Sequence, residues 1–182
     1  RHYGVSVERM GEALKAIEFP GVQSVQLVFN MLRQRPVDDL FVETRRRRVA
    51  VIARVPLASG MLTGKMTPQT KFARDDHRSF NRDGSAFDRG ETFGGVDYKL
   101  GLRAVEELRP IVPDGWTMAQ MALRWILAFD AVTCAIPGAR NPTQVDDNVR
   151  AGALPSLTED RRASIRSVYD RLLRSAVHNQ WH

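Results

Sequence analysis

The sequence contains a single cysteine, Cys134, and therefore cannot form an internal disulfide. This cysteine lies in the apolar run AVTCAI, where a thiol usually behaves as a small hydrophobic side chain. No apolar run approaches the roughly 20 residues of a membrane-spanning helix, and no apolar signal core follows the first basic residue. The four histidines lack metal-ligand spacing. We therefore expect a cytoplasmic protein that has no membrane segment and no metal site.

Acidic residues are in the minority, and the net charge of +6 raises the question of a nucleic-acid partner. The strongest local support is the run from Arg45 to Arg48. This run follows the amphipathic segment DDLFVETR, whose acidic residues come first, as in a helix that complements its own dipole. No aromatic interleaving or nucleic-acid-binding motif accompanies the charge. We therefore interpret the arginines as a helix C-terminus and expect no nucleic-acid partner.

Short apolar segments alternate with amphipathic ones along the whole chain. Hydrophobic residues make up 43% of the sequence and charged residues 26%, which is enough for one core. The apolar segments are suited to burial on both faces, so the pattern predicts an α/β fold with a parallel sheet and right-handed crossovers. The four predicted strand segments are a short extended entry ending at 4–6, then 24–30, 49–55 and 131–136.

Helices are predicted between and after these strands, over 36–45, around 96–108 and over 117–129. Pro142 occupies a position suited to the first turn of a further helix. Several polar residues are spaced to cap helix N-termini, some of them with a Gln that completes a capping box. These capping candidates are Ser6 for the run VERMGEALKAI, Thr117 with Gln120, Asn141 with Gln144, and Thr158.

No linker divides the sequence, so we expect one domain over residues 1–182, with a closing helix and tail at 158–182. The segment 66–95 is rich in Arg, Asp, Ser and Gly and shows neither helical nor strand periodicity. A loop of this length after a strand usually serves a ligand, and a floppy surface excursion is the alternative. The chain begins with Arg1, and apolar residues follow almost at once, so we expect a longer parent protein.

The segment VIARVPLASGMLTGK at 51–65 has the composition of a phosphate cradle. Small residues let backbone N–H groups approach an anion, and Lys65 adds a positive charge. It is not a Walker A loop, because the spacing from Gly60 to Gly64 is one residue too short and Met66 replaces the magnesium-binding hydroxyl. A nucleotide triphosphatase is therefore not expected.

A second anion site is predicted after the last strand, in IPGARNPTQVDDN at 136–148. Gly138 opens a turn, Arg140 supplies a charge, and a helix N-terminus follows. Gln144 and Asn148 are four residues apart and project from one helical face. The two anion sites follow successive strands, so together they suit one extended anionic ligand.

The motifs GVS, QLVFN, PLASGMLTGK, ALRWIL and IPGARNPTQVDDN resemble those of the aldo/keto reductases, in order and at the expected spacing. The ending AVHNQW is similar to bacterial members. The resemblance covers essentially the whole chain. It implies the C-terminal half of a TIM-type (β/α)8 barrel, with strands five to eight and the closing helices.

The resemblance also implies a nicotinamide cofactor, usually NADP(H), across the carboxyl ends of the strands, and a parent enzyme that reduces aldehydes or ketones to alcohols. Each binding position is carried over by matching motifs. The carboxamide contacts match Ser6 and Gln26, and the position of a ring against nicotinamide matches Arg54. The pyrophosphate belt matches Pro56, Leu57, Ser59, Leu62 and Lys65. The 2′-phosphate pocket matches Gly138, Arg140 and Gln144, and the adenine contacts match Asp147 and Asn148.

Three positions depart from the family pattern. Val7 replaces an Asn that often follows Ser6, which removes one carboxamide hydrogen bond. Arg54 replaces an aromatic residue; its planar guanidinium can still stack, but it places a positive charge beside the nicotinamide ring. Gly138 stands where some members use a Lys, so a preference for NADP(H) depends on Arg140.

The family's catalytic Asp, Tyr, Lys and His belong to strands two to four and have no counterpart in this sequence. Tyr3, Tyr98 and Tyr169 do not occupy matching motifs, so we assign no catalytic residue and expect the isolated chain to be inactive. A half barrel exposes the edges of its first and last strands, so a partner is expected: the N-terminal half barrel or a second copy. The alternatives are a non-catalytic nucleotide-binding or regulatory module and a truncated product that needs a partner.

Overall fold

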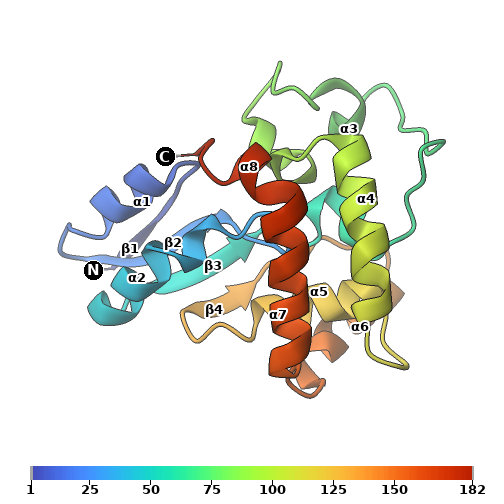
Figure 1. Cartoon of the computed structure of the whole chain (residues 1–182). Helices are drawn as coiled ribbons and strands as arrows, with labels where there is room; N and C mark the ends of the chain where they lie inside the picture. The colour runs from blue at the N-terminus through green and yellow to red at the C-terminus, as the bar shows by residue number, and fades with distance from the viewer. Residues whose placement is uncertain (1, 182) are drawn as a thin grey trace.

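The computed structural model describes residues 2–181, in which four parallel strands form one sheet in the order β1-β2-β3-β4 (Figure 1). Each strand joins the next through a connection that contains a helix, as parallel neighbours require. The predicted α/β fold with parallel strands is confirmed. The strands are β1 (Tyr3–Ser6), β2 (Val22–Val28), β3 (Ala50–Arg54) and β4 (Val132–Ala135).

Helices α2 and α5 pack against the sheet, and α4 and α7 stand side by side (Figure 1). None of the helices within residues 2–181 has both the length and the apolar character to cross a membrane. The α-helices are α1 (Met10–Ala16), α2 (Leu40–Arg47), α3 (His77–Phe80), α4 (Tyr98–Leu108), α5 (Met118–Ile126), α6 (Pro142–Ala153), α7 (Glu159–Val168) and α8 (Arg174–Val177). The 3-10 helices are η1 (Arg35–Val37), η2 (Ala58–Thr63), η3 (Arg89–Glu91), η4 (Phe93–Gly95) and η5 (Arg109–Ile111), and η6 (Tyr169–Leu173) is a π-helix.

One face of the sheet forms the core. Side chains at alternate positions of β2 and β3 are fully or almost fully buried beneath helices α1, α2 and α5. Trp125 of α5 stacks on Phe29 at 5.0 Å between ring centroids, which confirms that this tryptophan belongs to the core. The buried sheet residues are Val25, Leu27, Val51 and Ala53.

The opposite face of the sheet is more exposed, except at its carboxyl end, where Val28 and Arg54 are buried. Ser24, Gln26 and Ile52 are only half-buried, and Ser6 is exposed. Within residues 2–181, β1 pairs only with β2 and β4 only with β3. The predicted open edges at the first and last strands are therefore present, and each leaves backbone N–H and C=O groups without a strand partner.

The prediction that Ser6 caps the first helix is wrong. Ser6 stays in β1, where it pairs with Gln26, and α1 begins only at Met10. The side chain of Glu12 accepts hydrogen bonds from the backbone N–H groups of Glu8 and Arg9, at 3.1 and 3.0 Å. Sheet pairing therefore keeps Ser6 extended, and an acid inside the helix takes over the N-terminus.

The predicted helix at 36–45 divides into two. Pro36 lies in the first turn of η1, and α2 begins at Leu40 and ends at Arg47. Arg48 adopts a left-handed conformation, with φ at 57°, and ends the helix. The interpretation of Arg45 to Arg48 as a helix C-terminus is confirmed.

The capping predictions at the remaining helices are largely correct. Thr117 and Gln120 form the capping box of α5, and Thr158 caps α7. Asn141 caps α6 through a 3.0 Å hydrogen bond from the Gln144 N–H. Gln144 does not complete the predicted capping box, because its side-chain oxygen accepts from the backbone N–H of Arg140 rather than from that of Asn141.

Candidate functional site at the carboxyl ends of the strands

Two polar residues lie near the carboxyl ends of β1 and β2: Ser6 is the last residue of β1, and Gln26 precedes the end of β2 by two residues. Ser6 and Gln26 are register partners, and the backbone N–H of Val7 donates to the Gln26 carbonyl at 3.0 Å. Ser6 is exposed and Gln26 is half-buried, so both side chains are accessible from the more exposed face of the sheet. Ligands of parallel α/β sheets bind at these carboxyl ends. The structure thus places two of the predicted site residues side by side.

Arg54, the last residue of β3, is held by two carboxylates. Its guanidinium forms ion pairs with Glu91 and with Glu8, the latter at 2.6 Å, and donates to the Val7 carbonyl at 2.9 Å. Only 10% of the Arg54 side chain is exposed. Sequence reasoning placed Arg54 at this site and missed both acids. The position of Glu8 directly after a strand is a usable signal, but Glu91 lies in the long loop, where no pattern pointed to it.

The turn after β3 has an unusual backbone. Val55, Ala58 and Ser59 have φ angles of 53°, 47° and 54°, in the left-handed region that residues with a Cβ rarely adopt. Gly60 follows with φ at 91°. Backbone strain of this kind persists only when surrounding contacts fix it, and it concentrates at functional sites.

Contacts to the long loop fix this turn. The Ser59 hydroxyl donates to the Glu91 carbonyl at 2.9 Å and accepts from the Phe93 N–H at 3.1 Å. The hydroxyl is therefore engaged within the chain. Of the other predicted belt residues, Pro56 and Leu62 are buried, Leu57 is half-buried, and Lys65 is exposed beyond η2.

Residues 66–95 form a loop with its own packed contacts rather than an extended surface loop. Asn81 is fully buried; its amide donates to the Thr92 hydroxyl at 3.2 Å, and its oxygen accepts from the N–H groups of Ala86 and Phe87. Phe93 is buried in the main core. The loop lacks regular periodicity because internal side-chain bonds and short helices, rather than a repeating apolar face, hold it together.

Trp181 fastens the end of this loop. Its indole N–H donates to the Asp88 carboxylate at 3.1 Å, and the Arg33 guanidinium lies 3.7 Å from its ring centroid. A Cβ on Gly95 would lie 2.1 Å from the indole, so glycine is required there. Burial lowers the pKa of Arg33 to about 10, although Asp88 and Glu8 oppose that shift. The sequence does not decide whether Trp181 faces substrate or solvent. In the structure, its ring packs against Arg33.

The second predicted anion site lies at the start of α6. Arg140 is exposed and forms none of the ion pairs found within residues 2–181, and a Cβ on Gly138 would meet open space. The Gln144 side chain accepts from the Arg140 N–H at 2.7 Å, so it must leave that bond to contact a ligand. Asp147 and Asn148 are half-buried on the same helix.

The sheet brings the two anion sites together. Ala53 of β3 is the register partner of Ala135 of β4, and the Ile136 N–H donates to the Ala53 carbonyl at 3.0 Å. The strained turn and the Gly138 turn therefore start from neighbouring strand ends. Lys65 is exposed, and the carbonyl of the adjacent Gly64 accepts from Arg109 of η5.

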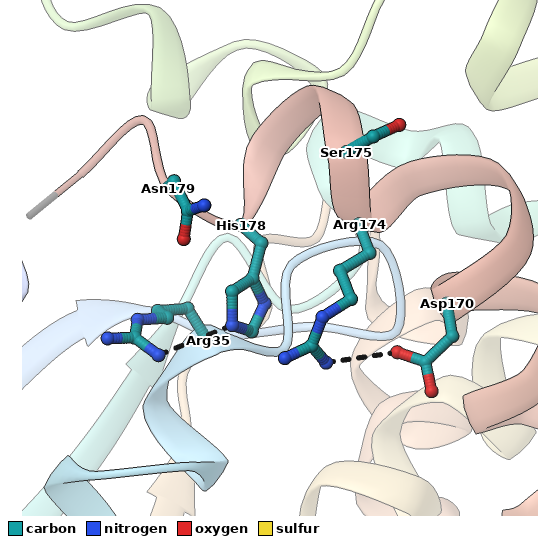
Figure 2. A pocket seen from close by; sticks show the side chains of 6 residues that line it. All are labelled: Arg35, Asp170, Arg174, Ser175, His178 and Asn179. Carbon is teal, nitrogen blue, oxygen red and sulfur yellow. Dashed lines mark hydrogen bonds and ion pairs between the residues drawn. The ribbon is translucent and has the colours of Figure 1, made fainter.

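A further polar cluster lies between η1 and the last helices, around a pocket of about 420 Å³ (Figure 2). His178 lies 3.0 Å from the Asp38 carboxylate through Nε2 and 2.9 Å from the Tyr169 hydroxyl through Nδ1. Burial lowers the pKa of His178 and raises that of Tyr169. The pocket is lined by Arg35, Asp170, Arg174, Ser175, His178 and Asn179.

The tyrosine of this pair is enclosed within the protein. Tyr169 is 1% exposed, and its raised pKa makes it a weaker acid. The pair is a hydrogen-bonded polar group inside the core. Sequence reasoning missed it, because Asp38 and His178 lie 140 positions apart and form no motif.

Comparison with known proteins identifies the family. The sequence model described as "Aldo/keto reductase family" matches residues 1–170. The chain belongs to the aldo/keto reductase family, and the family suggested by the sequence motifs is confirmed.

Individual relatives agree with this assignment. The uncharacterised oxidoreductase YqkF of Bacillus subtilis is 25% identical over 92% of this chain and 49% of its own length. The L-glyceraldehyde 3-phosphate reductase of Escherichia coli strain K12 is 35% identical over 57% of this chain and 28% of its own length. The chain thus spans about half the length, or less, of these relatives.

Solved structures show the same fold. The glycerol dehydrogenase of Gluconobacter oxydans aligns with a TM-score of 0.75 at 24% identity, covering 100% of this chain and 53% of that one. An aldo-keto reductase from Bacillus halodurans in its holo form aligns with a TM-score of 0.70 over 99% of this chain.

Proposed function

We propose that this chain is the cofactor-holding half of an NADP(H)-dependent oxidoreductase that reduces aldehydes or ketones to alcohols. In this proposal its four strands correspond to strands five to eight of the family's barrel. The observation that carries it is the arrangement at the carboxyl edge of the sheet. Ser6 and Gln26 are register partners near the ends of β1 and β2, and the exposed Arg140 follows β4.

The residues at this edge fit the parts of such a cofactor. The Ser6 hydroxyl and the Gln26 amide supply the donors and acceptors that a carboxamide needs. Arg140, beside a helix N-terminus and an open glycine turn, suits a phosphate group. When bound, the nicotinamide ring supplies hydride. Arg54 fits less well as a stacking platform, because its guanidinium is already engaged by Glu8 and Glu91.

We also propose that the chain alone does not turn over a carbonyl substrate. Reduction needs a positioned acid that gives a proton to the carbonyl oxygen. Tyr3 lies at the start of β1, Tyr98 at the start of α4, and Tyr169 is buried beside His178. Tyr3 lies at the amino end of its strand, and the hydroxyls of Tyr98 and Tyr169 are already bonded, to the Thr67 carbonyl and to His178.

The missing groups would come from a partner that completes the barrel. The sheet's more exposed face and its two edge strands, β1 and β4, are suited to pairing with parallel strands on both sides. We propose the N-terminal half barrel as this partner, with a second copy of the chain as the alternative.

The phosphate assignment is tested by Arg140→Ala. We expect this variant to weaken NADPH binding at least ten-fold and NADH binding by much less, because only NADPH carries the 2′-phosphate and a charge-assisted contact contributes about 1.5–3 kcal/mol. A fluorescence titration with both cofactors measures the two losses. Arg103→Ala, an exposed arginine on α4, is the matched control. Equal losses for NADPH and NADH in Arg140→Ala would reject the assignment.

A further inference from the structure

The ion cluster at the end of β3 contains more negative than positive charge. The Arg54 guanidinium contacts two carboxylates, Glu8 from the segment after β1 and Glu91 from η3. One cation and two anions leave a net charge of −1. The Glu8 and Glu91 side chains are 37% and 31% exposed, so they are partly shielded from water but face the same edge as the candidate site.

Two further charged groups, Arg33 and Asp88, lie beside this cluster. Arg33 is buried beside the cluster, and its Nη2 donates to the Glu8 carbonyl at 3.1 Å. Asp88, which accepts from the Trp181 indole, contributes one further negative charge near Arg33. The five charged groups together, two arginines and three acids, again sum to −1.

The register of the sheet places this cluster next to the proposed carboxamide contacts. Arg54 is two residues beyond Ile52, which pairs with Gln26, and Gln26 in turn pairs with Ser6. The Arg54 Nη2 also donates to the carbonyl of Val7, the residue after Ser6. The anionic cluster and the Ser6 and Gln26 pair therefore share one end of the site.

We propose that Glu8 and Glu91 make the nicotinamide end of the site anionic, so that the chain binds NADP+ more tightly, relative to NADPH, than an uncharged site would. This inference rests on the proposed function. The oxidised nicotinamide ring carries a positive charge and the reduced ring carries none, so a nearby net negative charge attracts only the oxidised form. The acids thereby outweigh the positive charge that Arg54 alone would place beside the ring.

A purely structural role for Glu91 predicts a different result. Its backbone carbonyl accepts from the Ser59 hydroxyl, so Glu91 also fastens the long loop to the strained turn. Loosening that loop would weaken the binding of both cofactor forms to the same degree. The ratio of the two dissociation constants separates the electrostatic role from the structural one.

The test compares NADP+ and NADPH binding by isothermal titration calorimetry at low salt. Glu91→Gln and Glu8→Gln keep the side-chain shape and a hydrogen-bond acceptor for Arg54 but remove one charge each. We expect each to raise the Kd for NADP+ relative to that for NADPH by about two- to ten-fold, and the effect to shrink in high salt. Arg54→Gln should shift the ratio in the opposite direction.

The matched control is Glu18→Gln. Glu18 is an exposed acid that follows α1 and precedes β2, at the opposite end of the sheet. We expect it to leave the ratio unchanged. Circular dichroism checks that each variant folds. If Arg54→Gln does not fold, the Kd ratios of Glu8→Gln and Glu91→Gln decide the matter.

The outcomes distinguish the two proposals. If Glu8→Gln and Glu91→Gln weaken NADP+ and NADPH binding equally, or leave the ratio of the two Kd values unchanged, the electrostatic inference is overturned and the cofactor site stands. Failure of the wild-type chain to bind either form overturns the proposed function, and this inference with it.

Discussion

Arg54 illustrates how the effect of one side chain depends on its neighbours. Considered alone, an arginine at this position adds a positive charge beside a nicotinamide ring. The structure surrounds it with Glu8 and Glu91, so the cluster carries the opposite sign. Breaking such a partly buried group by removing one member is costly, because the remaining charges lose their partners.

His178 gives a prediction about pH at the residue scale. Burial lowers its pKa, and the nearby arginines Arg174 and Arg35 act in the same direction while Asp38 opposes them. The unfolded chain therefore takes up a proton before the folded one does. The stability that His178 contributes is fully present above the ordinary histidine pKa of about 6.5 and is lost as the pH falls below it.

The measurement is urea unfolding across this pH range. We expect His178→Gln to show a smaller loss of unfolding free energy between pH 7 and pH 5 than the wild type. Asn179→Ala, which changes a neighbouring pocket residue that does not titrate, should keep the wild-type slope. The same slope in His178→Gln and the wild type would contradict the assignment.

At the scale of elements, the loop 66–95 links the turn after β3 to the chain end. Ser59 and Arg54 hold Glu91, and Trp181 holds Asp88 and fills the space beside Gly95. The loop thus depends on contacts made by residues far away in sequence.

Replacing Trp181 tests this dependence. We expect Trp181→Ala to lower the free energy of unfolding by about 3 kcal/mol, because it empties a buried ring site and removes the stack on Arg33. The loop should also become more sensitive to limited proteolysis. Phe19→Ala, at a residue that is 55% exposed, is the control and should change stability little. An unchanged proteolysis pattern in Trp181→Ala would mean that the indole does not fasten the loop.

The elements also show which features the sequence predicts well. The strands and the caps Thr117, Asn141 and Thr158 follow from residues within a few positions of one another, and the structure confirms them. Ser6 was assigned wrongly because a strand partner, which local patterns do not reveal, holds it in the sheet.

The charge cluster could not be predicted in the same way. Arg54 meets Glu91 across 37 positions and Glu8 across 46, and no periodicity connects them. Resemblance to the family's motifs assigned Ser6, Gln26 and Arg140 to one cofactor site, and the parallel sheet places them toward a common edge. The motifs carried no information on which side chains the long loop would bring to that edge.

At the scale of the whole molecule, one face of the sheet is buried under helices and the other is more exposed. The half-buried Gln26 and Ile52 and the exposed Ser6 all belong to that more exposed face. The two edge strands lie at opposite sides of it. The proposed site and the proposed partner surface therefore meet along the same face, so completing the barrel would also enclose the nicotinamide end of the site.

The most direct test of the central claim uses the monomer fraction of the purified chain, with its molar mass checked by light scattering. This fraction is mixed with NADPH and a panel of aldehydes and ketones, and the fluorescence of the cofactor is followed. We predict a rapid change on binding and no steady loss afterwards, because the chain holds the cofactor without a proton donor. A steady loss of NADPH fluorescence with any of these carbonyl compounds, from a species with the monomer's mass, would contradict the account.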